Sequence, residues 1–223
     1  ACTLAAAQTQ PAPWPSQPIK LLVGFPAGGA SDIMARLIAH KLSLGLGQPV
    51  VVENRPGAAG TLAASLTARA TGDGHTLLLH NMGIATAPAL YAKLTFDATK
   101  DLAPIALAGD VPMILVGNKN FAPGNIGELI KVMKNKPGEV TFAHAGVGAT
   151  SHLCAMLVNQ TAGTQATMVP YKGTGPALQD VISGNVNVIC DQPVATGSHI
   201  QAGLLKAYGC LFYTTDAADE EDM

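Results

Sequence analysis

The chain contains few charged and few aromatic residues. Of its 223 residues, 13% are charged, 4% are aromatic and only three are arginine. Few aromatic side chains are therefore available to stack on nucleic-acid bases or on sugars. The formal net charge of −2 offers no basic surface for a polyanion. Neither a nucleic-acid partner nor electrostatic binding to a membrane is implied, whereas the apolar fraction of 48% supports a well-buried core.

Long apolar segments are also missing. No run reaches the roughly 18 consecutive apolar residues of a membrane-spanning helix, so no such helix is expected. Residues 1–8, ACTLAAAQ, resemble the small-residue end of a secretory signal peptide, and residues 8–18 form a polar, proline-rich lead-in. Ala1 and Cys2 could instead end a lipoprotein signal, with Cys2 acylated.

Cysteines are few, and their spacing fits no zinc-ligand pattern. The four are Cys2, Cys154, Cys190 and Cys210. The favoured interpretation of Cys154 and Cys190 is that both are small buried apolar residues. A Cys190–Cys210 disulfide is the alternative, if the two strands that carry these residues are neighbours. No metal and no other cofactor is predicted.

Short apolar runs alternate with helical periodicity along the chain, and this pattern predicts an α/β fold. In the first unit, a strand over residues 19–25 leads into a glycine-rich turn. A helix follows, beginning near Asp32 and ending near Gly45 or Gly47. Its spacing of apolar residues predicts one core-facing stripe, formed by Ile33, Leu37, Ile38 and Leu42.

Two glycine-rich turns share one chemistry. Residues 26–31 and 145–151 are both small and glycine-rich, and each ends in Ser or Thr at the expected start of a helix. Backbone N–H groups and the helix dipole favour an anion at such a turn. Neither turn is a dinucleotide or P-loop fingerprint and neither has a lysine for a phosphate chain, which favours a small carboxylate. If the turns lie on opposite lobes, they could face each other across a cleft.

These residues resemble the substrate-binding receptors of tripartite tricarboxylate transporters, also called Bug-type receptors. The resemblance spans roughly residues 14–209. Its motifs follow in the order found in that family, at residues 14–20, 25–36, 51–60, 88–91, 145–153 and 169–173.

The resemblance implies a periplasmic, two-lobed α/β protein of the Venus-flytrap type. Such a protein is a monomer that closes on a carboxylate and delivers it to the membrane permease. The expected divisions are a signal-peptide remnant and linker (1–15), lobe 1 (16–103), lobe 2 (104–210) and a divergent acidic tail (211–223). Full-length members continue beyond this chain with elements that return to the first lobe, so the chain resembles a C-terminally truncated member whose first lobe is incomplete.

The resemblance also implies a set of ligand-binding residues. In this family, backbone amides of the two turns and bridging waters hold a carboxylate group. Residues 80–86 and 170–173 are expected to line the rest of the pocket, and Asp191 is expected to face the cleft. The implied ligand-binding residues are Ala27, Gly28, Gly29, Asp32, Gly146, Gly148, Ala149, Thr150, Ser151, Tyr171, Lys172 and Asp191.

Other interpretations stay open for several of these residues. Asp32 could cap the first helix, and Lys172 could be a solvated loop residue. Ser151 or Thr150 could be the nucleophile of a hydrolase that uses the 145–152 turn as an oxyanion site, although no G-x-S-x-G elbow is present. His152 is interpreted as an ordinary packing histidine. A remnant that no longer binds any ligand is a further alternative.

Overall fold

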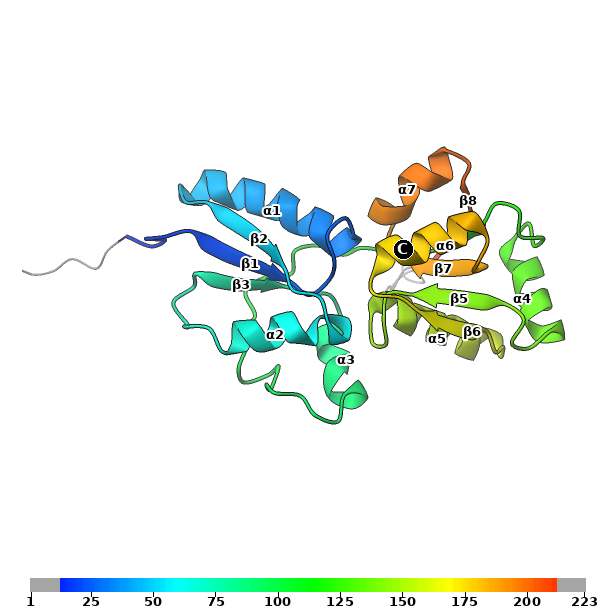
Figure 1. Cartoon of the computed structure of the whole chain (residues 1–223), viewed down its shortest axis with the longest axis horizontal. Coiled ribbons are helices and arrows are strands. Elements are labelled where there is room, and N and C mark those ends of the chain that lie inside the picture. The colour runs from blue at the N-terminus through cyan, green and yellow to red at the C-terminus, as the bar shows by residue number, and fades with distance from the viewer. Residues whose placement is uncertain (1–12, 212–223) are drawn as a thin grey trace, which may run out of the picture.

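The computed structural model describes residues 13–211, which form two groups of helices and strands (Figure 1). Strands from residues 19–79 build one sheet, and strands from residues 113–211 build the other. The predicted two-lobed α/β fold is therefore confirmed. Cys2 with its proposed acylation, residues 1–12 of the signal remnant and the acidic tail beyond Leu211 lie outside the described residues. Within residues 13–211, no helix is long and apolar enough to cross a membrane.

The first lobe has a parallel three-stranded sheet in the order β2-β1-β3. Its strands are β1 (Ile19–Val23), β2 (Val50–Asn54) and β3 (Thr76–Leu79). Apart from the exposed Lys20, the central strand is buried and apolar, as is typical of parallel sheets. Helices α1 (Ala30–Leu46) and α2 (Thr61–Ala68) lie on opposite sides of the sheet (Figure 1). The short helix η1 (Ala58–Gly60) directly precedes α2, and helix α3 (Gly83–Leu90) follows β3.

The second lobe has a mixed five-stranded sheet in the order β6-β5-β7-β4-β8. Its strands are β4 (Met113–Asn118), β5 (Thr141–His144), β6 (Thr167–Pro170), β7 (Val188–Asp191) and β8 (Leu205–Leu211). Strand β4 runs antiparallel to both of its neighbours, whereas β5 is parallel to β6 and β7.

Four helices cover the two faces of this second sheet and enclose its two apolar cores. They are α4 (Ile126–Asn135), α5 (Thr150–Ala162), α6 (Thr174–Ser183) and α7 (Pro193–Gln201). One core packs α4 and α5 around Phe142, and the other packs α6 around Ile189. This arrangement brings the N-terminal ends of α5, α6 and α7 to the carboxyl ends of β5, β6 and β7, where the second lobe meets the first (Figure 1).

The core-facing side of α1 differs from the predicted stripe. The buried residues are Ala30, Asp32, Ala35 and Ala39, whereas Leu37 is 59% exposed. Small alanines let the helix lie close to β1 and β2, and Asp32 is buried because other groups bind its carboxylate. The prediction of a stripe through Leu37 is therefore wrong. The end of the helix was predicted correctly, since Gly47 adopts the left-handed conformation (φ 68°) that closes a helix.

Candidate functional site

Two adjoining cavities lie where the lobes meet. The smaller has a volume of about 60 Å³ and the larger about 570 Å³, and four residues line both. These shared residues are Ser31, Asn81, Thr150 and Gln192. The smaller cavity is lined from the first lobe by the turn after β1 and from the second lobe by the turn after β5. The two glycine-rich turns therefore do face each other, as their common chemistry suggested.

Four helices begin at the small cavity. Its lining includes the first residues of α1, α5 and α6 and the residue that precedes α7, namely Ala30, Thr150, Thr174 and Gln192. The first N–H groups of a helix have no partner within that helix, and the aligned peptide dipoles place partial positive charge there. Four helix N-termini at one cavity therefore favour the binding of an anion there.

None of these four helices has a side-chain cap at its N-terminus. By contrast, the side chain of Asn125 caps α4, whose start is remote from the cavity. Helices α2 and α3 are also uncapped, so a missing cap does not by itself mark the site. No lysine or arginine is among the described residues that line either cavity. Among the residues that line the small cavity, only backbone N–H groups therefore contribute positive potential.

Asp32 braces the first turn from behind rather than lining either cavity. Its carboxylate accepts hydrogen bonds from the Gly28 N–H (2.9 Å) and the Asn54 side-chain amide (2.9 Å), and it pairs with Arg36 (3.0 Å). Burial opposes ionisation of Asp32, but the bonds from Arg36, Gly28 and Asn54 outweigh it and hold the pKa below its usual value. The Gly28 amide is thus engaged within the protein. Ala27 and Gly29 do line the small cavity.

Two histidines brace the second turn. The Gly146 N–H donates to His144 Nδ1 and the Gly148 N–H donates to His152 Nδ1, each at 3.3 Å. The two rings are 4.6 Å apart, and burial lowers the pKa of both. Gly146 and Gly148 therefore do not present their amides to the small cavity.

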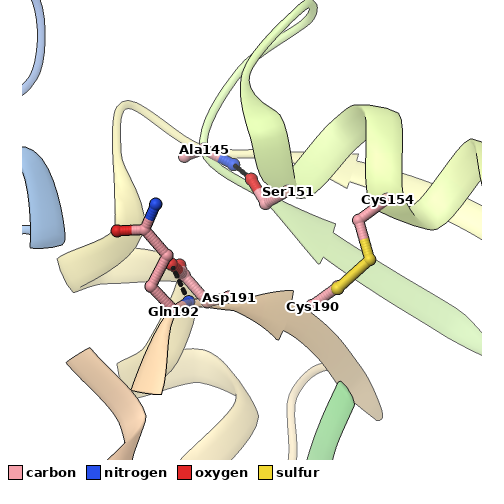
Figure 2. Close-up of a disulfide and its surroundings, with 6 residues drawn as sticks. All are labelled: Ala145, Ser151, Cys154, Cys190, Asp191 and Gln192. Carbon is pink, nitrogen blue, oxygen red and sulfur yellow. Dashed lines mark hydrogen bonds between the residues drawn. A yellow bond between two sulfur atoms is a disulfide. The ribbon is translucent and has the colours of Figure 1, made fainter. Parts of the chain in front are cut away.

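Ser151 also stabilises this turn through a hydrogen bond. Its buried Oγ accepts the Ala145 N–H at 2.9 Å (Figure 2). Because both His144 and His152 use Nδ1 to accept turn amides, neither Nδ1 is available to Ser151 as a base. Ala149, Thr150 and Ser151 all line the small cavity, so this end of the turn is the part that reaches it.

Buried polar atoms without a partner gather at these cavities. Among the described residues, four buried side-chain atoms have no hydrogen-bond partner. Three belong to residues of the cavity walls, and these are Thr150 Oγ1, Asp191 Oδ2 and His80 Nε2. Buried polar groups normally have hydrogen-bond partners. Thr150 Oγ1 and Asp191 Oδ2 are therefore candidates to bond a ligand, whereas His80 Nε2 lies against the backbone of Gly60.

Asp191 ends β7 at the wall of the small cavity. Its Oδ1 accepts the Gln192 N–H at 2.7 Å (Figure 2), and the residue is 4% exposed. Burial raises the pKa of Asp191 to about 6, although the Thr174 hydroxyl and the Gln192 amide act in the opposite direction. The prediction that an acidic residue lies at the cleft thus matches its position.

Tyr171 and Lys172 line neither cavity. The Tyr171 hydroxyl donates to Asp180 Oδ2 at 2.6 Å, and the Lys172 side chain is exposed.

Thr174 and Gln192 line the small cavity but were not among the predicted site residues. The signal was present, because Gly173 and Pro176 mark the start of a helix and Pro193 marks another. Of the 80–86 loop, His80, Asn81 and Met82 line the cavities.

A disulfide joins Cys154 of α5 to Cys190 of β7, with Cα atoms 6.2 Å apart (Figure 2). Both cysteines are buried, as expected, but they are bonded to each other and are not free thiols. The alternative pairing of Cys190 with Cys210 is wrong, because β4 lies between β7 and β8. The disulfide closes a 36-residue separation. It also couples two parts of the cavity wall, since Ser151 is three residues before Cys154 and Asp191 directly follows Cys190.

Comparison with known proteins decides the family. Residues 34–218 match the model of the "Tripartite tricarboxylate transporter family receptor". The chain belongs to this family. It is 39% identical to BugT of Bordetella pertussis over 200 residues, which are 89% of the chain and 61% of that protein.

Solved structures of receptors confirm the fold. A Rhodopseudomonas palustris protein solved with adipate has a TM-score of 0.85 and 33% identity, over 89% of this chain and 67% of that one. MatC from the same organism, solved with malate, has a TM-score of 0.83 and 38% identity, over 88% and 67%. The chain spans 56–61% of the length of the first curated relatives. The family is one of receptors and not of enzymes, so the hydrolase alternative is set aside.

Proposed function

We propose that the protein is an extracytoplasmic receptor that binds a small organic carboxylate in the smaller cavity. The ligand carboxylate accepts N–H groups from the first turns of α1, α5 and α6, and the Thr150 hydroxyl adds a side-chain donor. Bridging waters extend the reach of these donors. The bound acid is then delivered to a permease of the tripartite tricarboxylate type.

The observation that carries this proposal is the meeting of four helix N-termini at one cavity that also holds the unpartnered Thr150 Oγ1. Hydrogen bonds to a charged group contribute about 1.5–3 kcal/mol each, and a partly buried helix end adds up to about 2 kcal/mol. Three or four donors then suffice for micromolar affinity, about −8 kcal/mol, after the cost of association. An arginine clamp is not required.

The larger cavity supports a ligand with an apolar body. It continues from the smaller one at Ser31 and Thr150, and Met34, Leu79 and Met82 contribute apolar side chains to its wall. Two of the similar solved structures hold adipate and malate. Both are dicarboxylates, and a short dicarboxylate is accordingly the ligand class that we infer.

Closure of the two lobes over the ligand is the proposed mechanism. We assign residues 16–103 to lobe 1 and residues 104–210 to lobe 2. The Tyr91 hydroxyl donates to the Val147 carbonyl between them at 2.6 Å, and Pro26 lies against Gly173. These contacts can form only when the lobes are together. A monomer that exposes its closed surface to the permease is the simplest partner arrangement.

The disulfide supports an extracytoplasmic location, which family membership also implies. Disulfides persist in oxidising compartments such as the periplasm, and Cys154–Cys190 is fully buried in the core of the second lobe. We propose a periplasmic protein that would be held at the membrane surface if Cys2 is acylated.

Thermal unfolding in the presence of mono-, di- and tricarboxylates, including malate and adipate, tests the proposal. A ligand at about 100 times its dissociation constant stabilises by roughly 2.7 kcal/mol, which raises the Tm of a chain of this size by about 5–10 °C. Adipamide, which has the same skeleton without charge, is the matched control and should leave Tm unchanged. A transition indifferent to every acid would contradict the proposal and favour a non-binding remnant.

A further inference from the structure

Asp191 presents a problem for an anion site. Its Oδ2 is buried, has no hydrogen-bond partner and belongs to a residue in the wall of the small cavity. Its Oδ1 already accepts the Gln192 N–H. The Thr174 hydroxyl also favours the ionised form, but neither this hydroxyl nor the Gln192 N–H carries a charge. An ionised Asp191 would therefore place a second negative charge, without a cation to balance it, beside the proposed ligand carboxylate. Two carboxylates that share a dry site cannot both ionise without a large cost.

No positive side chain relieves this conflict. Asp191 is the only titratable residue among the described residues that line the small cavity. The elements packed around Asp191 within the second lobe carry four titratable side chains, which are His144 (β5), His152 (α5), Asp180 (α6) and His199 (α7), and β4 carries none. From the first lobe, α1 carries Asp32, Arg36, His40 and Lys41. Asp32 is paired with Arg36, and Asp180 binds Tyr171. His80 and Asp110 line only the larger cavity.

We propose that Asp191 is a neutral carboxylic acid in the ligand complex and donates its O–H to the ligand carboxylate, so that the protein takes up one proton with each ligand. The inference rests on the proposed function, since it concerns the same cavity. The proton comes from solvent, resides on Oδ2 and returns to solvent when the ligand leaves. No other bond is made or broken.

Protonation removes the negative charge of Asp191 and makes its carboxyl group a hydrogen-bond donor. Burial already raises the pKa of Asp191 to about 6 in the ligand-free protein, and a neighbouring anion raises a carboxyl pKa further. Above that pH the ionised Asp191 lies at the helix N-termini and competes with the ligand for their positive potential. Affinity should then fall by about tenfold for each pH unit, because one proton must be taken up for every ligand bound.

The test is calorimetric titration with malate and with adipate between about pH 6.5 and 8.5, where both acids are essentially ionised. Repeating the titration in buffers of different ionisation enthalpy gives the number of protons taken up. For the unsubstituted protein we expect close to one proton per ligand. In Asp191→Asn, the amide keeps the acceptor for Gln192 and supplies a permanent donor. That variant should take up no proton and keep its affinity across the range.

Glu139→Gln is the matched control, because Glu139 is an exposed carboxylate paired with Lys136 and remote from both cavities. It should behave as the unsubstituted protein does. Binding with no proton uptake and no pH dependence would overturn this inference and leave the proposed function intact. Loss of binding in a folded Asp191→Asn at every pH would also overturn it, because an amide N–H donor at this position would then fail to replace the carboxyl O–H. Absence of binding by every acid at every pH would overturn the proposed function and this inference together.

Discussion

Cys154 and Cys190 form a disulfide that holds the start of helix α5 against the end of strand β7 (Figure 2). Ser151, which supports the second turn, is three residues before Cys154, and Asp191, which lines the small cavity, directly follows Cys190. The disulfide therefore fixes the distance between two parts of the site that come from elements far apart in the sequence. In this lobe, the stability of the fold and the geometry of the site depend on the same bond.

Replacing both cysteines with alanine should lower the free energy of unfolding by about 3–4 kcal/mol, as expected for a closed loop of this length. The chain-entropy cost of the open loop and the lost packing of two buried side chains act together. Denaturant unfolding measures the change. Cys210→Ser is the control, because Cys210 is exposed and has no disulfide partner among the described residues. A double variant as stable as the unsubstituted protein would show that the disulfide constrains nothing.

Thr150 and Ser151 are adjacent hydroxyl residues with opposite expected roles. Ser151→Ala leaves the buried Ala145 N–H without its acceptor, so the free energy of unfolding should fall by about 1–3 kcal/mol. Thr150→Val removes a hydroxyl that has no partner in the ligand-free protein. It should leave unfolding almost unchanged yet weaken carboxylate binding about tenfold or more, the value of one charged hydrogen bond.

Unfolding and calorimetric titration of these two variants separate the roles. If Thr150→Val is destabilised while its affinity is retained, the assignment of Thr150 as a ligand donor is contradicted.

Lowering the pH below about 6.5, the usual histidine pKa, should destabilise the protein. Burial lowers the folded-state pKa of His80, His144 and His152. The unfolded chain therefore binds more protons than the folded chain, and the free energy of unfolding falls as pH falls. Protonation also removes the Nδ1 acceptors of the Gly146 and Gly148 amides. Urea unfolding between about pH 5 and 7.5 measures this effect.

Asp191 acts with the opposite sign. Its folded-state pKa is raised to about 6, so its contribution is present at low pH and is lost as pH rises through about 6. Three histidines act in one direction and one carboxyl group in the other, so we expect a net decline toward acid pH, which Asp191→Asn should make steeper. A free energy of unfolding that is constant or rises as the pH falls from about 7 to 5.5 would contradict this account.

Gly24 and Gly45 provide a matched pair of glycine substitutions. A Cβ on Gly24 would overlap the Gly60 Cα, where the turn after β1 packs against the turn after β2. Backbone must move to admit it, so Gly24→Ala should destabilise strongly and loosen the first turn. Gly45 lies in α1 with nothing near its missing Cβ, and Gly45→Ala should stabilise by about 0.5–1 kcal/mol. Thermal unfolding of both variants measures these changes in stability. Equal changes in Tm for the two variants would contradict the close approach of the two turns.

Local patterns in the sequence predicted most of the fold. Alternating strand and helix periods gave the α/β class, and Gly47 gave the end of α1. Periodicity could not choose between two adjacent stripes on α1, because alanines at 35 and 39 pack closely while Leu37 stays exposed. The strand order of the second lobe is non-local, and it decided that Cys190 pairs with Cys154 rather than Cys210.

The sequence predicted part of the cavity wall, and the ligand-binding roles of these residues remain a prediction. The two glycine-rich turns do meet at one cavity, because the edge of each sheet that carries one of these turns lies where the two lobes meet. Which amides are engaged elsewhere depends on buried side chains, such as Asp32 binding Gly28 and His152 binding Gly148. Tyr171 is oriented toward Asp180 by the packing of α6, and no local sequence pattern encodes that choice.

The central claim is that a carboxylate binds at the meeting helix N-termini, and amide NMR tests it most directly. Titration of the isotope-labelled protein with malate or adipate should shift the backbone N–H resonances of Ser31, Thr150 and Gly175 most strongly, because these residues lie in the first turns of α1, α5 and α6. The first turn of α4, capped by Asn125, should be unaffected. Largest shifts outside the three first turns, or no shifts with either acid, would contradict the account.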